Sequence, residues 1–307
     1  MTRHLAIALT GGTGLIGSAV RNLLSESHPV VTIGRGRGAD LVADLSQPDA
    51  VAAMDLSGCE ALVHCAGIVD EDFTNSERAF RQATQGMAAL VARAKAAGIR
   101  RFVYVSSAHI YGRFTGVISE ASTPNPLHDY AIAHFASEQI LRRATTPDFQ
   151  ALVLRPCAVF GIPPELARFR RWALIPFGFP KAAVEDGVIA LASRGLQRRN
   201  FVGTEDIAQQ IKQWLCEKNE NPFTALNCVG KESMTVLAFA EMCSQISEKV
   251  TGRKCRITRP DGDNPEPDSF EYTTSETARI GKTDLGATLE HLTRMLSGSH
   301  VPAAEVN

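Results

Sequence analysis

The chain has 307 residues, of which 44% are hydrophobic and 21% are charged, and its formal net charge at pH 7 is −1. A charge balance this close to zero gives no long-range field that would favour nucleic acid or an anionic membrane surface as a partner. The length suits one large α/β domain, or a nucleotide-binding domain with a smaller partner, and it allows a sizeable core without disulfides.

The cysteines and the apolar runs exclude several further classes. The seven cysteines are scattered and include no Cys-x-x-Cys pair, which predicts reduced thiols and no metal site. The apolar run Leu5–Leu9 is too short for a signal peptide. No apolar stretch approaches the roughly 18 residues that a membrane helix needs. We therefore expect a cytoplasmic protein without a membrane segment.

A glycine-rich turn, Thr10-Gly11-Gly12-Thr13-Gly14-Leu15-Ile16-Gly17, follows the run Leu5–Leu9 and opens a helix-like segment. Strand, glycine turn and helix in this order predict a dinucleotide site. Gly11 permits the tight turn, Gly14 lets the backbone approach a pyrophosphate, and Gly17 lets helix and strand pack closely. The Gly-x-x-Gly-x-x-Gly spacing resembles that of the short-chain dehydrogenase/reductase superfamily. The cofactor-binding residues predicted in the turn are Gly11, Thr13, Gly14, Leu15, Ile16 and Gly17.

The second predicted strand, Val30–Ile33, indicates which dinucleotide is bound. An acidic residue about 20 residues beyond the glycines would hold the ribose 2′-hydroxyl of NAD. Gly34 stands at that place, followed by Arg35 and Arg37. Because a guanidinium offers a planar fork to a phosphate, the sequence favours NADP, with NAD still possible. A basic loop exposed to solvent is the alternative.

Two later segments are expected to complete the cofactor site. The superfamily places its adenine-edge contacts at the end of a short extended piece, here Asp44 and Leu45. The next apolar strand is similar to the one that passes beneath the adenine and ribose. Its end, Cys65-Ala66-Gly67, is therefore predicted to lie against the cofactor. A long alanine-rich helix is predicted over residues 76–97, with a glycine after its end.

The most specific signal combines a strand end, Ser106-Ser107-Ala108-His109-Ile110-Tyr111-Gly112, with the downstream segment Tyr130-Ala131-Ile132-Ala133-His134. Together they resemble the extended short-chain dehydrogenase/reductases, also called the NAD-dependent epimerase/dehydratase family. The resemblance implies that Ser107 binds the substrate oxygen, with Ala108 beside it. It also implies that Tyr130 is the acid/base of a Tyr-x-x-x-Lys pair. His109 and His128 could also approach this site.

The lysine of that pair is replaced by His134. Hydride transfer at a carbon requires a proton to move on the attached oxygen, and a phenol with an ordinary pKa of about 10 needs help to act as a base. Three interpretations stay open. His134 replaces the lysine and holds the nicotinamide ribose, with slower or pH-sensitive chemistry; or a residue remote in sequence supplies the charge; or the site binds cofactor without turnover.

Two arginine motifs resemble the substrate site of nucleotide-sugar epimerases. The segment Gln197-Arg198-Arg199-Asn200-Phe201-Val202 is similar to the one whose arginine clamps the substrate diphosphate, and Arg199 takes that place. Arg259-Pro260-Asp261-Gly262-Asp263 is similar to the family's Arg-Pro-Gly-Asp turn with one residue inserted, so Arg259 is expected at the same diphosphate. Two convergent arginines suit a pyrophosphate.

The resemblance covers nearly the whole chain and implies a Rossmann-type doubly wound parallel sheet with a small discontinuous C-terminal substrate cap. Residues 1–160 are expected to form the NAD(P)-binding domain, together with returning strands near 200–206 and 224–229. Residues 161–199 and 230–298 would form the cap, and residues 299–307 a loose tail.

The family implies an NAD(P)-dependent oxidoreductase or epimerase, in most members a homodimer, acting on a hydroxyl or keto carbon of a nucleotide sugar. A 4-keto reductase or a 4-epimerase fits best. A 4,6-dehydratase is disfavoured, because Ala108 and His109 stand where dehydratases carry an acidic pair. Family asparagines are absent at Ala83 and near Cys157, which leaves a reductase of a non-sugar carbonyl as one alternative. A catalytically weak NADP-binding protein is the other.

Overall fold

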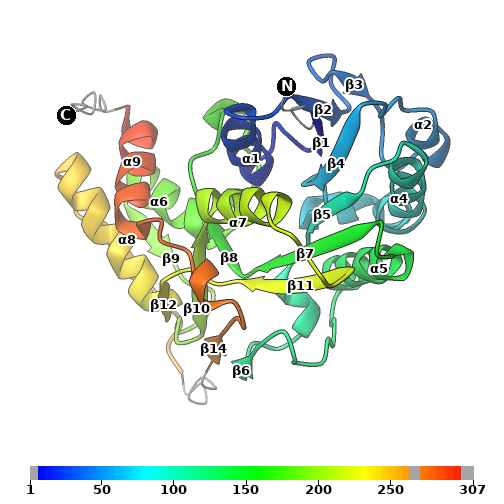
Figure 1. Ribbon diagram of the computed structural model, residues 1–307. Coiled ribbons are helices and arrows are strands. Elements are labelled where there is room, and N and C mark those ends of the chain that lie inside the picture. Colours follow the sequence, from blue (N-terminus) through cyan, green and yellow to red (C-terminus); the bar gives the residue numbers. More distant parts are fainter. Residues whose placement is uncertain (1–5, 263–269, 299–307) are drawn as a thin grey trace.

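Seven parallel strands form the central sheet, in the order β11-β7-β5-β4-β1-β2-β3 (Figure 1). The structure is a computed structural model and describes residues 6–262 and 270–298. Every hydrogen-bonded pair in this sheet runs parallel, which confirms the predicted fold class. The strands are Ala6–Thr10 (β1), Val30–Gly34 (β2), Leu41–Val42 (β3), Cys59–His64 (β4), Arg101–Val105 (β5), Gln150–Pro156 (β7) and Phe223–Cys228 (β11).

Alternate residues of these strands face two helical layers, because successive side chains of a strand point to opposite faces. Ile7 and Leu9 of β1 pack in the core under helices α1 and α7, whereas Ala8 packs in the core under α2, α4 and α5. In Figure 1, α1 and α7 lie side by side in front of the sheet. The five helices are Leu15–Ser25 (α1), Pro48–Ala52 (α2), Met87–Ala96 (α4), Asp129–Ala144 (α5) and Thr204–Cys216 (α7).

The long helix predicted over residues 76–97 is present, with an irregularity in its middle. It consists of α3 (Ser76–Arg81), a π-helical turn (Gln82–Gly86) and α4. A Cβ on Gly86 would lie 1.9 Å from the carbonyl oxygen of Leu45. Only glycine therefore lets this helix rest directly on the loop that follows β3.

Helices and short strands from the second half of the chain form a second body, to the left of the sheet in Figure 1. Helices α6, α8 and α9 pack on one another and share a core with strands β8, β9 and β10. The bounds are Ala158–Phe160 (β8), Ile175–Glu185 (α6), Val188–Ala190 (β9), Arg198–Gly203 (β10), Glu232–Thr235 (β12), Val236–Thr251 (α8), Arg256–Thr258 (β13) and Leu285–Ser297 (α9). A further pair, β6 (Gly116–Ile118) and β14 (Phe270–Tyr272), runs parallel. Short 3-10 turns occupy Asp70–Asn75 (η1), Ala108–Tyr111 (η3), Leu166–Arg168 (η4) and Thr277–Arg279 (η5).

One of the two strands expected to return to the central sheet does so, and the other does not. β11 pairs in parallel with β7 at the sheet edge. β10 instead pairs with β8 and β12 in a separate three-stranded sheet, so the expectation for the strand near residue 200 is wrong. The reason is its side chains: Phe201 is fully buried and stacks on Phe239 of α8, with ring centroids 4.6 Å apart. The predicted tail, 299–307, lies outside the described residues.

Within residues 6–262 and 270–298, no helix is long and apolar enough to cross a membrane. In that same part of the chain, no group of three or more His, Cys, Asp or Glu side chains is placed to hold a metal ion. All seven cysteines lie there and are free.

A buried ion pair fastens helix α5 to the sheet. Nε and Nη2 of Arg155 on β7 donate to the two carboxylate oxygens of Glu138 on α5, at 3.1 Å and 2.7 Å, and both side chains are almost completely buried. The remaining nitrogen of Arg155 donates to the Tyr111 hydroxyl, which in turn donates to Asn227. Every charged atom of the pair has a partner. The pair therefore fixes the position of α5, which includes Tyr130, relative to β7.

Removing one member of this pair should be costly, since it leaves a buried charge uncompensated. We expect Glu138→Ala to lower the free energy of unfolding by about 3–5 kcal/mol, measured by urea denaturation. Glu77→Ala is the matched control, because Glu77 forms an exposed i,i+4 pair with Arg81, and such pairs contribute at most about 1 kcal/mol. Equal losses for the two variants would contradict the assignment.

Candidate functional site

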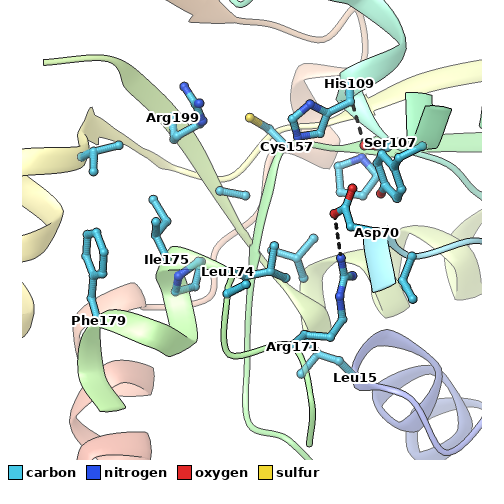
Figure 2. Close-up of a pocket in the computed structure, with 18 of the residues that line it drawn as sticks. Leu15, Asp70, Ser107, His109, Cys157, Arg171, Leu174, Ile175, Phe179 and Arg199 are labelled. Atoms are coloured by element: carbon cyan, nitrogen blue, oxygen red, sulfur yellow. Dashed lines mark hydrogen bonds and ion pairs between the residues drawn. The ribbon is translucent and has the colours of Figure 1, made fainter. Parts of the chain in front are cut away.

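A cavity of about 580 Å³ lies between the carboxyl ends of the central strands and the second body. The strand order reverses between β1 and β4, and ligands of open α/β sheets bind outside the carboxyl ends at such a point. Figure 2 shows side chains entering this cavity from both sides, among them Ser107 and Asp70 from the sheet side and Arg171, Ile175 and Phe179 from the other.

The glycine turn forms one wall of the cavity. Gly11 has φ +73°, and a Cβ there would lie 2.7 Å from the amide nitrogen of Ala66. A Cβ on Gly17 would lie 2.0 Å from the carbonyl oxygen of Gly11. Turn, helix α1 and the end of β4 are thus in direct backbone contact. The cavity is lined here by Gly14, Leu15, Ile16 and Gly17.

The start of α1 is suited to an anion. Gly14 is its N-cap, and no side chain in the described residues caps it. The amides of the first helical turn therefore lack helical partners and face the cavity, with the positive end of the helix dipole behind them. These are the groups that hold a dinucleotide pyrophosphate, so the residues present fit the predicted cofactor.

The residues predicted for the adenosine end lie along the surface beyond the cavity. Arg35 and Arg37 are exposed in the loop after β2. Asp44 accepts hydrogen bonds from Ser46 and forms an ion pair with Arg78 at 2.8 Å. The other predicted positions differ in exposure. Thr13 is exposed, whereas Leu45 is buried in the core. Cys65 lines the cavity. The amide of Ala66 donates to Thr10, and Gly67 packs against His134.

Ser107 and Tyr130 both line the cavity, close enough together for the Ser107 side chain to favour the phenolate form of Tyr130. Ser107 is the N-cap of η3 and its Oγ accepts from the amide of His109 at 3.2 Å. Ala108, which the sequence predicts to bind the substrate beside Ser107, is fully buried. Burial raises the pKa of Tyr130 above its usual value, although the Ser107 side chain acts in the opposite direction. Tyr130 is therefore a neutral phenol at pH 7 in this arrangement.

His134 lies one helical turn from Tyr130 and is buried, with both ring nitrogens engaged by protein groups. Its Nε2 lies 3.0 Å from the carbonyl oxygen of Ile68, and its Nδ1 lies 2.6 Å from the hydroxyl of Tyr104. A carbonyl only accepts, so Nε2 carries the proton and Nδ1 accepts from Tyr104. Burial lowers the pKa of His134 to about 3, which keeps the imidazole neutral. The sequence predicts that His134 hydrogen-bonds a ribose hydroxyl, but both of its ring nitrogens are already bonded, to Tyr104 and to Ile68.

His134 still contacts Tyr130 directly, because their rings meet edge to face with centroids 4.5 Å apart. Its Cε1 atom would lie 3.1 Å from a Cβ on Gly67. The close approach predicted for Gly67 is therefore made to this imidazole. The geometry favours a histidine that sets the position of Tyr130 and supplies no charge.

Two cavity residues have no local sequence signal that marks them. Arg171, between η4 and α6, reaches the cavity beside Leu15 and forms ion pairs with Asp70 and Glu71 (Figure 2). Ser106 lines the cavity with an Oγ that is buried and has no hydrogen-bond partner in the described part of the chain. Arg171 stands in a run of basic residues and Ser106 precedes the motif serine, so only the fold identifies either one.

His109 also lines the cavity, as one sequence interpretation allowed. Its ring lies 5.0 Å from that of Phe114 and 5.9 Å from that of Tyr130. Burial lowers the pKa of His109 to about 4, so it is a neutral hydrogen-bonding group.

The two arginines predicted to converge are not brought together. Arg199 lines the cavity with its guanidinium 5.1 Å from the ring of Phe114. Arg259 is exposed and is not among the cavity residues. The reason is the parallel pairing of β13 with β9, which ends at Thr258 and leaves the following turn at the surface.

Comparisons with known proteins agree with this architecture. The family model described as "NAD dependent epimerase/dehydratase family" matches residues 7–228. The chain is 29% identical over 174 residues to a UDP-glucose 4-epimerase of Azospirillum brasilense, covering 52% of this chain and 50% of that protein. It is 31% identical over 197 residues to a 2'-dehydrokanamycin reductase of Streptomyces kanamyceticus, covering 60% and 52%. The chain thus spans about half the length of these curated relatives.

A similar solved structure is that of the UDP-glucuronic acid 4-epimerase from Bacillus cereus, in complex with UDP-glucuronic acid and NAD. It is 19% identical, covers 96% of this chain and 100% of that one, and has a TM-score of 0.76. At this identity the likeness concerns the fold alone.

The contact between Gly17 and Gly11 gives a direct test of the cofactor cradle. We expect Gly17→Ala to weaken NADPH binding about tenfold or more, because its Cβ cannot fit against the Gly11 carbonyl. Titration of the intrinsic fluorescence measures it. Gly286→Ala in the first turn of α9, where a Cβ meets nothing closer than 3.4 Å, is the control. Unchanged affinity in Gly17→Ala would rule out this turn as the binding site.

Proposed function

The chain belongs to the NAD dependent epimerase/dehydratase family, and on that premise we propose that it reduces a keto carbon, or epimerises a hydroxyl carbon, of a nucleotide sugar with an NAD(P) cofactor. One observation carries the proposal: a single cavity joins the uncapped start of α1, the Ser107–Tyr130 pair and the guanidinium of Arg199. An anion cradle, a proton donor and a phosphate ligand in one space are what this reaction needs.

For the cofactor we propose NADP. Gly34 takes the place of the acidic residue that would hold a ribose 2′-hydroxyl, and Arg35 and Arg37 are exposed beside it, free to meet a 2′-phosphate. A cofactor consumed in each cycle is usually NADPH, which favours a 4-keto reductase over an epimerase.

The chemistry assigned to the chain's own residues is proton transfer and orientation. The bound nicotinamide would supply or accept the hydride. In the reductive direction the Tyr130 hydroxyl donates its proton to the oxygen of the substrate, and in the oxidative direction the phenolate removes that proton. Ser107 hydrogen-bonds the same oxygen and fixes its distance to Tyr130, while His134 holds the tyrosine ring in place. Arg199 binds the diphosphate.

A second candidate substrate is a carbonyl compound without a nucleotide. It is favoured by the exposed position of Arg259, which leaves Arg199 without the second arginine expected for a diphosphate. Apolar side chains from α6 and β9, such as Ile175, Phe179 and Leu191, line much of that end of the cavity.

The reaction itself can be tested with NADPH and a panel of UDP- and dTDP-linked 4-keto sugars, plus keto sugars without a nucleotide. We expect NADPH oxidation with a nucleotide-linked member. In Tyr130→Phe, turnover should fall about 100-fold or more, because the proton donor is lost, while NADPH affinity stays nearly unchanged. Turnover confined to the free keto sugars would establish the second candidate. Tight NADPH binding without turnover on any substrate across pH 5 to 9 would refute catalysis.

The cofactor preference rests on Arg35. We expect Arg35→Ser to raise the KM for NADPH about tenfold, through loss of a charge-assisted contact, and to leave the KM for NADH unchanged. Arg253→Ser, at an exposed arginine beyond the end of α8, serves as the control for surface charge. Parallel changes for both cofactors would refute recognition of the 2′-phosphate.

A further inference from the structure

We propose that Arg171 is the positioning residue that supplies the positive charge beside Tyr130, in place of the lysine that His134 has replaced. The inference rests on the acid/base role proposed for Tyr130 above. It names the group, remote in sequence, that makes the tyrosine usable when its helix neighbour is neutral.

The location of Arg171 supports this role. Its side chain enters the cavity that Tyr130 and Ser107 line, at the start of α1 where Leu15 stands (Figure 2). The guanidinium is directed by two carboxylates of η1: Nη2 lies 3.5 Å from Asp70 and Nε lies 3.6 Å from Glu71. The Nε atom is buried and has no hydrogen-bond partner in the part of the chain that the structure describes. The guanidinium is thus held at the cavity wall by two ion pairs, with one N–H left without a hydrogen-bond acceptor among the described residues.

The two buried histidines that contact Tyr130 do not supply a cation there. His134 and His109 face its ring from α5 and η3, and burial lowers their pKa values to about 3 and about 4, so both are neutral. His128 stacks on the ring from the exposed side. The ionisable groups that the structure places around Tyr130 in the described residues include the imidazoles His109, His128 and His134, the phenol Tyr104, the carboxylates Asp70 and Glu71, and the guanidinium Arg171.

Asp70 and Glu71 oppose the guanidinium at Tyr130, and each of them acts on the pKa of the phenol less strongly than Arg171 does. Their side chains are 60% and 43% exposed, whereas Arg171 is 28% exposed, so solvent screens the carboxylates more strongly. Arg171 accordingly lowers the pKa of Tyr130 more than either carboxylate raises it. A phenolate formed at Tyr130 therefore faces a fixed cation across the cavity.

Direct titration of Tyr130 tests the proposal without any substrate. The chain has four tyrosines, and burial raises the pKa of the other three, Tyr104, Tyr111 and Tyr272. The ultraviolet absorbance of the phenolate, followed against pH and corrected with Tyr130→Phe, isolates the residue of interest. We expect Arg171→Gln to raise its midpoint by about one pH unit, because the phenolate loses its cation. Arg171→Lys should retain most of the original midpoint.

Two further variants keep the test decisive. Arg168→Gln, an 82% exposed arginine nearby that does not line the cavity, should leave the midpoint unchanged. Asp70→Asn should lower the midpoint, because one opposing charge is removed, and this exposed position should tolerate the change. A midpoint that is the same in Arg171→Gln, Asp70→Asn and the intact protein would overturn the proposal.

The pH profile supplies the functional readout. Reduction requires the protonated phenol, so its rate falls as the pH rises through the pKa of Tyr130. Raising that pKa in Arg171→Gln should move the fall to higher pH and slow the oxidative direction near neutrality. A shifted titration in a protein without turnover would support the electrostatic role and count against the proposed function. Turnover with identical pH profiles in Arg171→Gln and in the intact protein would support the proposed function and refute the electrostatic role of Arg171.

Discussion

The contact between the Cα of Gly17 and the carbonyl of Gly11 is the constraint on which this architecture depends. There is no room for a side chain, since a Cβ would stand 2.0 Å from the carbonyl oxygen. The contact lets α1 begin directly at the end of β1, while Gly11 in turn rests on the backbone of Ala66 after β4. Two strands and one helix start are thereby held within a few ångströms of each other, and the amides of that helix start face the cavity. The same glycines that close the fold thus create its anion site.

The residue one helical turn after Tyr130 is a histidine, and its surroundings are built around that imidazole. An imidazole at His134 is flat and short enough to bridge Tyr104 and Ile68, and Gly67 leaves room for its edge. These bonds rigidify the tyrosine helix but use up both nitrogens and exclude a charge. Positive charge enters the cavity from the opposite wall through Arg171, oriented by the carboxylates of η1. In the proposed site, position and charge, which one lysine could supply together, are divided between His134 and Arg171.

The cavity exists because the second body is interleaved with the sheet along the chain. The chain leaves the sheet after β7, forms β8, α6 and β10, and returns through α7 and β11. The buried pair Glu138–Arg155 holds α5 against β7. Asp206 of α7 accepts hydrogen bonds from the backbone amides of Gly203, Lys282 and Thr283, which fixes the segment before α9. Residues separated by more than 60 positions, such as Tyr130 and Arg199, therefore line one space.

The sequence by itself predicted the parallel sheet that the structure shows. It also singled out Gly14, Ser107, Tyr130 and Arg199, which all line the cavity, because each stands in a motif with local spacing along one strand or one helix turn. Their roles stay predictions. The sequence could not place β10, whose buried Phe201 finds its partner in α8, nor show that β13 leaves Arg259 at the surface. It identified His134 as unusual without deciding its role. Its hydrogen-bond partners are Tyr104 and Ile68, which only the tertiary structure brings to the ring. Charge and hydrogen-bond partners in a cavity are set by distances between elements, and no local pattern encodes those distances.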